Sequence, residues 1–115
     1  MEKKFKIKLL DEAFEFIKSQ NNKVQDKIFY NIRKSQVLND PKLFKKLNQD
    51  IWEFRTKYAG LQYRILAFWD KENNEMTLVC GTHGFLKKTD KVSSKEIEKA
   101  EQIRAEYFER KNNER

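Results

Sequence analysis

Residues 51–69 read IWEFRTKYAGLQYRILAFW, and this stretch decides the fold. In its first half, apolar and polar residues alternate with the period of two that is typical of a half-buried β-strand. Gly60 marks a turn, and a second run of strand-forming residues then extends from Leu61 to Trp69. We therefore expect two strands joined by a short loop.

Further strand signals flank this pair. A polar turn at residues 70–74 precedes a third strand-forming run at residues 76–80. Near the start of the chain, Phe5, Ile7 and Leu9 alternate with lysines, as is typical of an edge strand with its lysines outward. The simplest pairing is a meander of three strands with the amino-terminal strand added at one edge.

Helical spacing of apolar residues is found between these strands. Residues 9–17 show it up to a polar break at residues 19–22, and residues 24–38 repeat it until Pro41 ends the pattern. Because proline is tolerated at the first position of a helix, we also expect Pro41 to open a short helical turn through Leu47.

A last helix is expected to begin after Ser93. The motif SSKE from Ser93 to Glu96 is a capping box, in which the Ser93 hydroxyl accepts a hydrogen bond from the Glu96 backbone N–H while the Glu96 carboxylate reaches back. The apolar stripe of this helix ends at Phe108, so residues 109–115 are expected to fray as a polar tail.

The order of elements, β-α-α-β-β-β-α, predicts an α+β fold. We expect an antiparallel sheet of about four strands with its helices on one face, namely an amino-terminal helical hairpin and a carboxy-terminal helix. The length of 115 residues fits one domain, which we place at residues 1–108.

The composition excludes several classes of protein. Fifteen aromatic residues are too many for a disordered chain, although 37% of the residues are charged. The chain lacks both an apolar run long enough to cross a membrane and the pattern of a secretory signal, so we expect no membrane partner and a cytoplasmic location. One cysteine and one histidine are too few for an intrachain disulfide or a zinc site, and we expect no cofactor.

The net charge of +7 is unevenly distributed. Residues 1–10 carry four bases against one acid, residues 41–70 six against three, and residues 83–93 three against one, whereas the predicted helices are neutral. A clustered basic excess favours binding to a polyanion such as RNA, because each base that meets a phosphate releases condensed counterions. The alternative is that the charge serves only solubility.

Strand alternation gathers polar and cationic side chains on one face of the first strand pair. Glu53, Arg55 and Lys57 share a parity, and Arg64 shares its parity with Gln62, so Arg64 can lie beside Arg55. Two adjacent arginines repel unless an anion or an acid lies between them. Glu53 is the ordinary partner, as one half of a surface ion pair.

His83 lies near the end of the third strand and is followed by Lys87 and Lys88. A lone histidine is commonly a packed or solvated residue, but these lysines would create a positive field that favours its neutral, base-competent form. Cys80 has no suitable partner for a nucleophilic role. The rings of Trp69 and Tyr107 can stack on a nucleobase, although packing is their ordinary role.

Four pieces in fixed order give the chain a recognisable signature. They are Trp52–Arg55, Tyr63–Ile65, His83–Thr89 and Glu96–Ala100. Together they resemble the phage-derived HigB-like branch of the RelE/ParE toxin superfamily, over roughly residues 43–108. The chain departs from this branch at residues 92–93, where Val-Ser stands in place of the usual Thr-Pro.

The resemblance implies a RelE-like fold and the toxin of a type II toxin–antitoxin system. Toxins of this branch are ribosome-dependent endoribonucleases that cut mRNA, need no metal, and are silenced by an antitoxin, commonly a HigA-like helix-turn-helix protein. The partners implied are therefore the ribosome, mRNA and a cognate antitoxin.

Carried onto this chain, the resemblance assigns a catalytic set. Its members are Arg55, Arg64, Lys87 and Lys88, together with His83. We expect Glu53 to be an alternative acid or base. Nearby lysines are expected to contact RNA phosphates, namely Lys45, Lys46, Lys57 and Lys91. This set supplies mainly cations, which stabilise the charge that develops when an RNA 2′-hydroxyl attacks its own phosphate.

Two other functions stay open on the sequence alone. The same fold serves ParE-like inhibitors of DNA gyrase, which need no histidine or paired lysines at the end of the sheet. The second is that of a non-catalytic phage protein that binds nucleic acid, and the basic charge is the only feature of the sequence that supports it.

Overall fold

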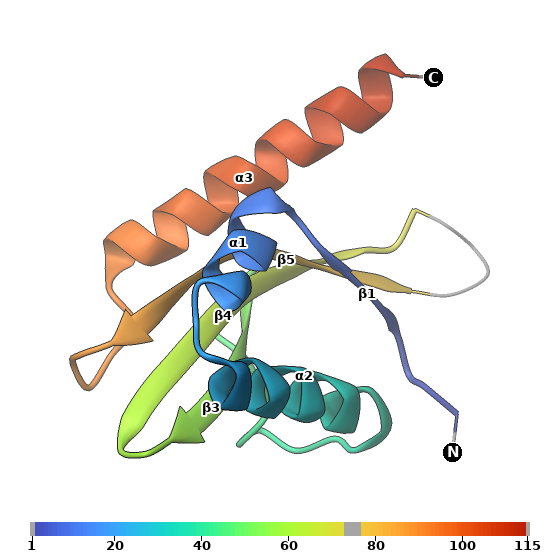
Figure 1. Cartoon of the computed structure of the whole chain (residues 1–115). Helices are drawn as coiled ribbons and strands as arrows, with labels where there is room; N and C mark the ends of the chain where they lie inside the picture. The colour runs from blue at the N-terminus through green and yellow to red at the C-terminus, as the bar shows by residue number, and fades with distance from the viewer. Residues whose placement is uncertain (1, 73–76, 115) are drawn as a thin grey trace.

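The protein is described here by a computed structural model over residues 2–72 and 77–114, which fold into three helices and a five-stranded sheet. In chain order the elements are β1 (Lys6–Leu9), α1 (Asp11–Lys18), α2 (Asn22–Val37), β2 (Phe44–Lys46), β3 (Trp52–Tyr58), β4 (Leu61–Asp70), β5 (Leu78–Lys87) and α3 (Ser94–Asn113). The strands lie in the order β1-β5-β4-β3-β2 (Figure 1). The predicted α+β class is confirmed.

The sheet differs from the prediction in two ways. β2 adds a further strand, and β1 pairs with β5 in parallel, so the sheet is mixed rather than antiparallel. The parallel pairing follows from the path of the chain. After β1, the helices α1 and α2 and the strands β2 to β4 bring the chain back to the end of the sheet at which β1 begins, and β5 starts there. Parts of the predicted turn and third strand fall in residues 73–76, which lie outside the described residues.

The helical turn expected after Pro41 is wrong, because the chain forms β2 there. Phe44 pairs with Phe54 on β3, and their rings stack with centroids 4.3 Å apart. Phe44 also stacks on Trp52 at 4.8 Å. Aromatic pairs across strands stabilise a sheet, and here they outweigh a weak local preference for helix.

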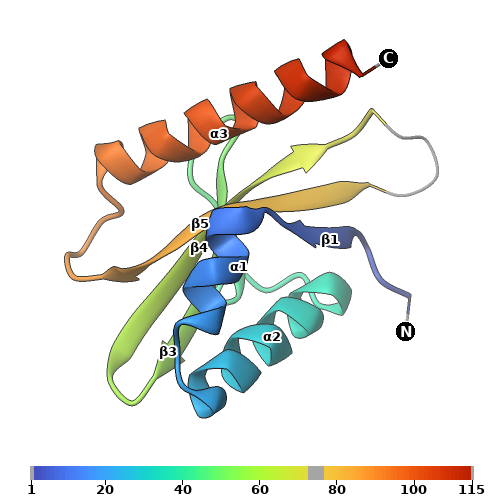
Figure 2. The ribbon, with the colours of Figure 1, turned by 45° about the horizontal axis from the view of Figure 1, so that its top comes forward.

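The helices cover both faces of the sheet, and not one face as expected. α1 and α2 pack on the face that carries Ile65 and Ala67 of β4, whereas α3 packs on the face that carries Leu66 and Phe68. Figure 2 shows α3 on one side of the sheet and α2 on the other. β4 is apolar on both faces at its centre, so each face needs its own cover.

α3 continues past Phe108 to Asn113, through most of the tail that we expected to fray. A buried carboxylate holds it: Asp70 Oδ2 accepts hydrogen bonds from the Tyr107 hydroxyl and the Lys111 ammonium, both at 2.7 Å. Burial alone would raise the pKa of Asp70, but the bonds from Lys111 and Tyr107 outweigh it and lower this pKa.

Gly84 provides a test of the packing between α1 and the sheet. A Cβ at this position would lie 2.2 Å from a ring carbon of Phe16, so a Gly84→Ala variant must displace that ring. We expect the free energy of unfolding, measured by urea denaturation, to fall by about 1–3 kcal/mol. In a Phe16→Ala background the same substitution should cost much less. An equal cost in both backgrounds would contradict the clash.

Candidate functional site

A tight turn sets the register of the two strands that carry the candidate arginines. Ala59 and Gly60, the residues between β3 and β4, have φ angles of 51° and 80°. Both angles lie in the left-handed region, as a type I′ hairpin turn requires. The resulting register places Arg55 directly opposite Arg64, as strand parity predicts.

The basic residues continue across neighbouring strands. Lys57 lies opposite Gln62, which in turn faces Lys87 on β5, and Lys45 on β2 lies opposite Glu53. Residues directly opposite one another in a sheet share a face. We use the term cationic face for the basic members of these rows, which are Lys45, Arg55, Lys57, Arg64 and Lys87.

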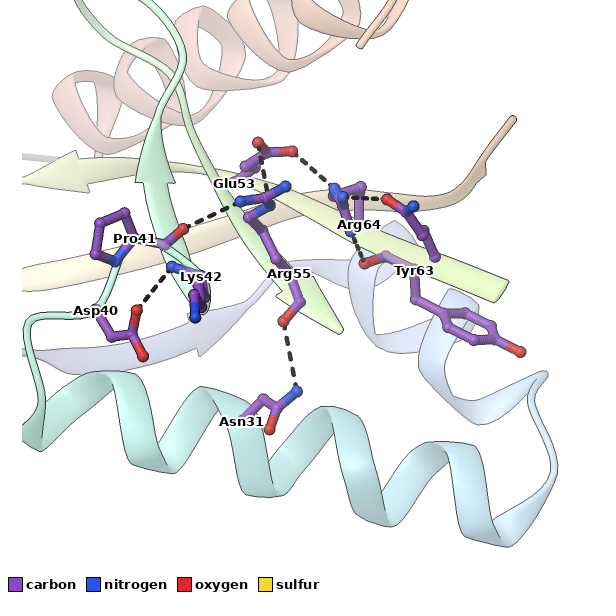
Figure 3. A network of polar contacts seen from close by, with 9 residues as sticks. Asn31, Asp40, Pro41, Lys42, Glu53, Arg55, Tyr63 and Arg64 are labelled. Carbon is purple, nitrogen blue, oxygen red and sulfur yellow. Dashed lines mark hydrogen bonds and ion pairs between the residues drawn. The ribbon is translucent and has the colours of Figure 1, made fainter. Parts of the chain in front are cut away.

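One carboxylate lies between the two arginines (Figure 3). Glu53 Oε1 is 3.1 Å from Arg64 Nε, and Glu53 Oε2 is 3.7 Å from Arg55 Nε. The Glu53 side chain is only 4% exposed, so it is a buried partner of both arginines and not one half of a surface pair. The three side chains together carry one net positive charge.

Arg64 is held inside the protein. Its side chain is 3% exposed, and it donates hydrogen bonds to the Tyr63 carbonyl at 3.2 Å and to Gln62 Oε1 at 2.6 Å. Burial lowers the pKa of the Arg64 guanidinium, Glu53 opposes this shift, and Arg55 adds to it. Arg64 therefore acts first on its protein neighbours, and a phosphate cannot reach it in this arrangement.

Arg55 is the arginine that meets solvent, with 29% of its side chain exposed. Its Nη1 donates to the Pro41 carbonyl at 3.3 Å, and its backbone N–H donates to the Leu43 carbonyl at 2.8 Å. Asn31 of α2 donates to its backbone carbonyl at 3.4 Å (Figure 3). The segment before β2 thus holds the guanidinium of Arg55, and α2 holds its backbone.

His83 lies at an irregularity of β5. Between the pairs of Ile65 and Ala67, the register of β4 with β5 shifts, so Thr82 and His83 both fall opposite Leu66. Such a bulge turns a side chain out of the regular alternation. The imidazole of His83 is 4% exposed and buried beneath the start of α3, where its Nε2 lies 3.1 Å from Glu96 Oε1.

The second ring nitrogen of His83 is also engaged, since Nδ1 lies 3.0 Å from the Thr82 hydroxyl. The pKa of His83 is lowered mainly by burial, while Glu96 opposes this shift and Lys99 adds to it. The neutral form is therefore favoured as expected, but its main cause is desolvation and not the lysines that follow the strand.

The structure separates the other predicted lysines from the cationic face. Lys46 lies opposite Trp52, on the other face of the sheet. Lys88 and Lys91 are exposed in the segment between β5 and α3. Of the nine predicted basic and histidine positions, the strand rows therefore bring together five, and His83 lies beneath α3.

Three contacts of this site were missed by sequence reasoning. Gln62, which binds Arg64, was visible as a residue of the same parity, but its role was not assigned. Ser93 Oγ accepts the Glu96 N–H at 3.3 Å as predicted, whereas the Glu96 carboxylate contacts His83. The contact between Thr82 and His83 could not be predicted, because the alternation of apolar and polar residues does not reveal the bulge that changes the direction of these side chains.

In residues 2–72 and 77–114, no group of three histidine, cysteine, aspartate or glutamate side chains is placed to hold a metal ion. None of the described helices is long and apolar enough to cross a membrane.

Comparison with known families identifies the class of protein. The chain is a member of the RelE/HigB-like toxin superfamily, as the resemblance implies. Within it, the chain belongs to the family of phage-derived Gp49-like proteins, whose family model matches residues 15–105. No curated protein matches the chain.

The burial of His83 predicts how stability depends on pH. Because the folded pKa lies below the usual 6.5, the unfolded chain binds more protons under acidic conditions. The free energy of unfolding should be constant above about pH 7 and should fall below about pH 6.5, by at most 1.4 kcal/mol per pH unit. Urea denaturation at several pH values measures this fall.

A His83→Gln variant is the control, because His83 is the chain's single histidine. Its stability should stay level between about pH 7 and pH 5.5, where few other side chains titrate. A fall of the same size in both proteins would contradict the assignment to His83.

Proposed function

We propose that this chain is a HigB-like toxin that cuts mRNA on the ribosome and thereby inhibits translation. The observation that carries the proposal is the cationic face, on which one partly exposed arginine and three lysines surround a buried Arg64–Glu53 pair. Membership of the Gp49-like family supports it.

The chemistry we propose is attack of an RNA 2′-hydroxyl on the adjacent phosphorus, with departure of the 5′ oxygen of the next nucleotide. Such a reaction needs an acceptor for the hydroxyl proton, a donor for the leaving oxygen, and cations for the charge that develops on the phosphate. The cationic face mainly supplies the cations.

The structure suggests different roles for the two arginines. Arg55 is partly exposed and can clamp phosphate oxygens, and Lys57 and Lys87 can act as point charges beside it. Arg64 is buried, and we propose that it is a positioning residue that holds Glu53 and, through it, Arg55.

Neither candidate base is open to solvent. The side chains of Glu53 and His83 are each 4% exposed, and both are engaged by protein neighbours. A toxin with so few free acid and base groups needs a macromolecular partner to orient its substrate, and we propose that the ribosome is this partner. RNA cleavage by the isolated protein should accordingly be slow.

The antitoxin partner is also part of the proposal. We propose that a cognate antitoxin, a HigA-like helix-turn-helix protein, silences the toxin. An acidic segment of such a protein would complement the charge of the cationic face.

Growth arrest in cells tests the role of Arg55. An Arg55→Ala variant should lose most of its toxicity, because removing one charge that stabilises a transition state typically costs about 100- to 1,000-fold in rate. Arg64→Ala should also relieve arrest, but with a lower thermal stability, since it leaves Glu53 buried without its nearest partner. Colony counts after induction, at equal protein level, measure the effect.

Lys23→Ala is the matched control, because Lys23 is exposed at the start of α2 and lies outside the cationic face. It should arrest growth as the wild type does. Full toxicity of the Arg55→Ala variant would remove Arg55 from the mechanism.

Primer extension on mRNA from induced cells distinguishes the proposed activity from the alternatives. A ribosome-dependent nuclease should produce cuts spaced by codons within translated regions. Intact messages together with DNA breaks would instead indicate a gyrase inhibitor, and intact messages without growth arrest would indicate a non-catalytic binding protein. Either of these results would contradict the proposal.

A further inference from the structure

A hollow of about 550 Å³ lies outside the cationic face, between the start of β3, the end of β4 and the carboxy-terminal half of α3. Its walls include the rings of Trp52, Trp69 and Phe108 and the side chains of Lys46 and Lys71. We call it the tryptophan hollow. Its volume is in the range of pockets that hold small organic ligands.

The aromatic walls remain partly open to solvent. Trp52 and Trp69 meet edge to face, with ring centroids 5.6 Å apart and planes at 74°. Both rings, and that of Phe108, are half-buried and not enclosed in the core. Phe44 stacks on one face of the Trp52 ring at 4.8 Å, so the part of each indole that remains exposed is the surface on which a nucleobase can stack.

The charges around the hollow favour an anion. Its two acids are already paired, with Asp50 3.7 Å from Arg104 and Glu72 3.4 Å from Lys111. Within the described residues, Lys46 and Lys71 form no ion pair, and Lys71 Nζ lies 5.6 Å from the centre of the Trp69 ring. Two exposed ammonium groups therefore lie at the hollow, and that of Lys71 lies over the Trp69 ring.

We propose that the tryptophan hollow binds single-stranded RNA, with a base on the indole rings and a neighbouring phosphate on Lys46 or Lys71. This combination of a stacking surface and lysines is the one by which proteins bind single strands with little sequence preference. An acidic peptide would use the lysines but not the rings, so the chemistry favours RNA.

The inference rests on the proposed function and extends it. Trp52 and Arg55 are both on β3, three residues apart, which is about 10 Å along a strand. Because three residues is an odd spacing, the two side chains lie on opposite faces of the sheet, so a short RNA segment that lies in the hollow would pass around the edge strand β2 to reach the cationic face. The hollow would then anchor message beside the point of cleavage.

The chain itself carries the reporter for a test, because Trp52 and Trp69 are its two tryptophans and both line the hollow. We expect the oligonucleotide U6 to quench the intrinsic fluorescence in a saturable manner. Affinity should fall with salt, and a double Lys46→Ala, Lys71→Ala variant should lower the slope of log affinity against log salt by about 0.7 for each lysine.

Matched variants locate the binding. Lys23→Ala and Lys27→Ala, on α2, should leave the affinity for U6 unchanged. Trp52→Phe and Trp69→Phe each leave one reporter, and both should still be quenched. Absence of quenching, or quenching that the double lysine variant does not weaken, would overturn the inference. Saturable quenching by hexaglutamate but not by U6 would assign the hollow to a protein partner, and would overturn it as well.

The test separates this inference from the proposed function. Arg55→Ala should lose toxicity and keep the quenching by U6, since Arg55 lies outside the hollow. Wild-type protein that is quenched through its lysines but neither arrests growth nor cuts mRNA would refute the nuclease and leave the hollow as an RNA site. Cleavage without any quenching would refute the hollow alone.

Discussion

The candidate site depends on one buried carboxylate. Glu53 contacts the guanidinium of Arg64 at 3.1 Å and that of Arg55 at 3.7 Å, and thereby allows two arginines to occupy facing positions on adjacent strands. Removing one partner of a buried ion pair typically costs about 3–5 kcal/mol, because a charge then remains without compensation. One carboxylate for two guanidiniums also leaves a net positive charge on this part of the sheet. The same contact thus stabilises the fold and leaves the positive charge to which, as we propose, an anion binds.

The rest of the fold holds this arrangement in place. The turn at Ala59 and Gly60 fixes the register, while α2 and the segment before β2 fix the backbone and side chain of Arg55. α3 covers the same face further along and is anchored at one end by His83 and at the other by Asp70. A cationic surface that is built on strands and held from several sides is rigid, which is what the binding of an RNA phosphate that we propose would require.

Sequence patterns predicted the elements that depend on local signals. The alternation in residues 52–57 placed Arg55 beside Arg64, and the capping serine placed the start of α3. Patterns did not predict β2, because its stability comes from rings of β3 that contact Phe44 across the sheet. They also did not show that Arg64 and His83 are buried, since burial depends on which helix covers which face. The exposed fraction of a side chain is set by tertiary packing, so strand alternation alone does not distinguish the partly exposed Arg55 from the buried Arg64.

We propose that Arg55, and not Arg64, supplies the guanidinium that receives an RNA phosphate. Nuclear magnetic resonance of the arginine Nε–H groups tests this proposal directly, with a 2′-O-methyl trinucleotide that cannot be cleaved as the titrant. We expect the Arg55 signal to shift progressively while the Arg64 signal stays in place. A shift of the Arg64 signal alone, or no shift of either, would contradict the proposal.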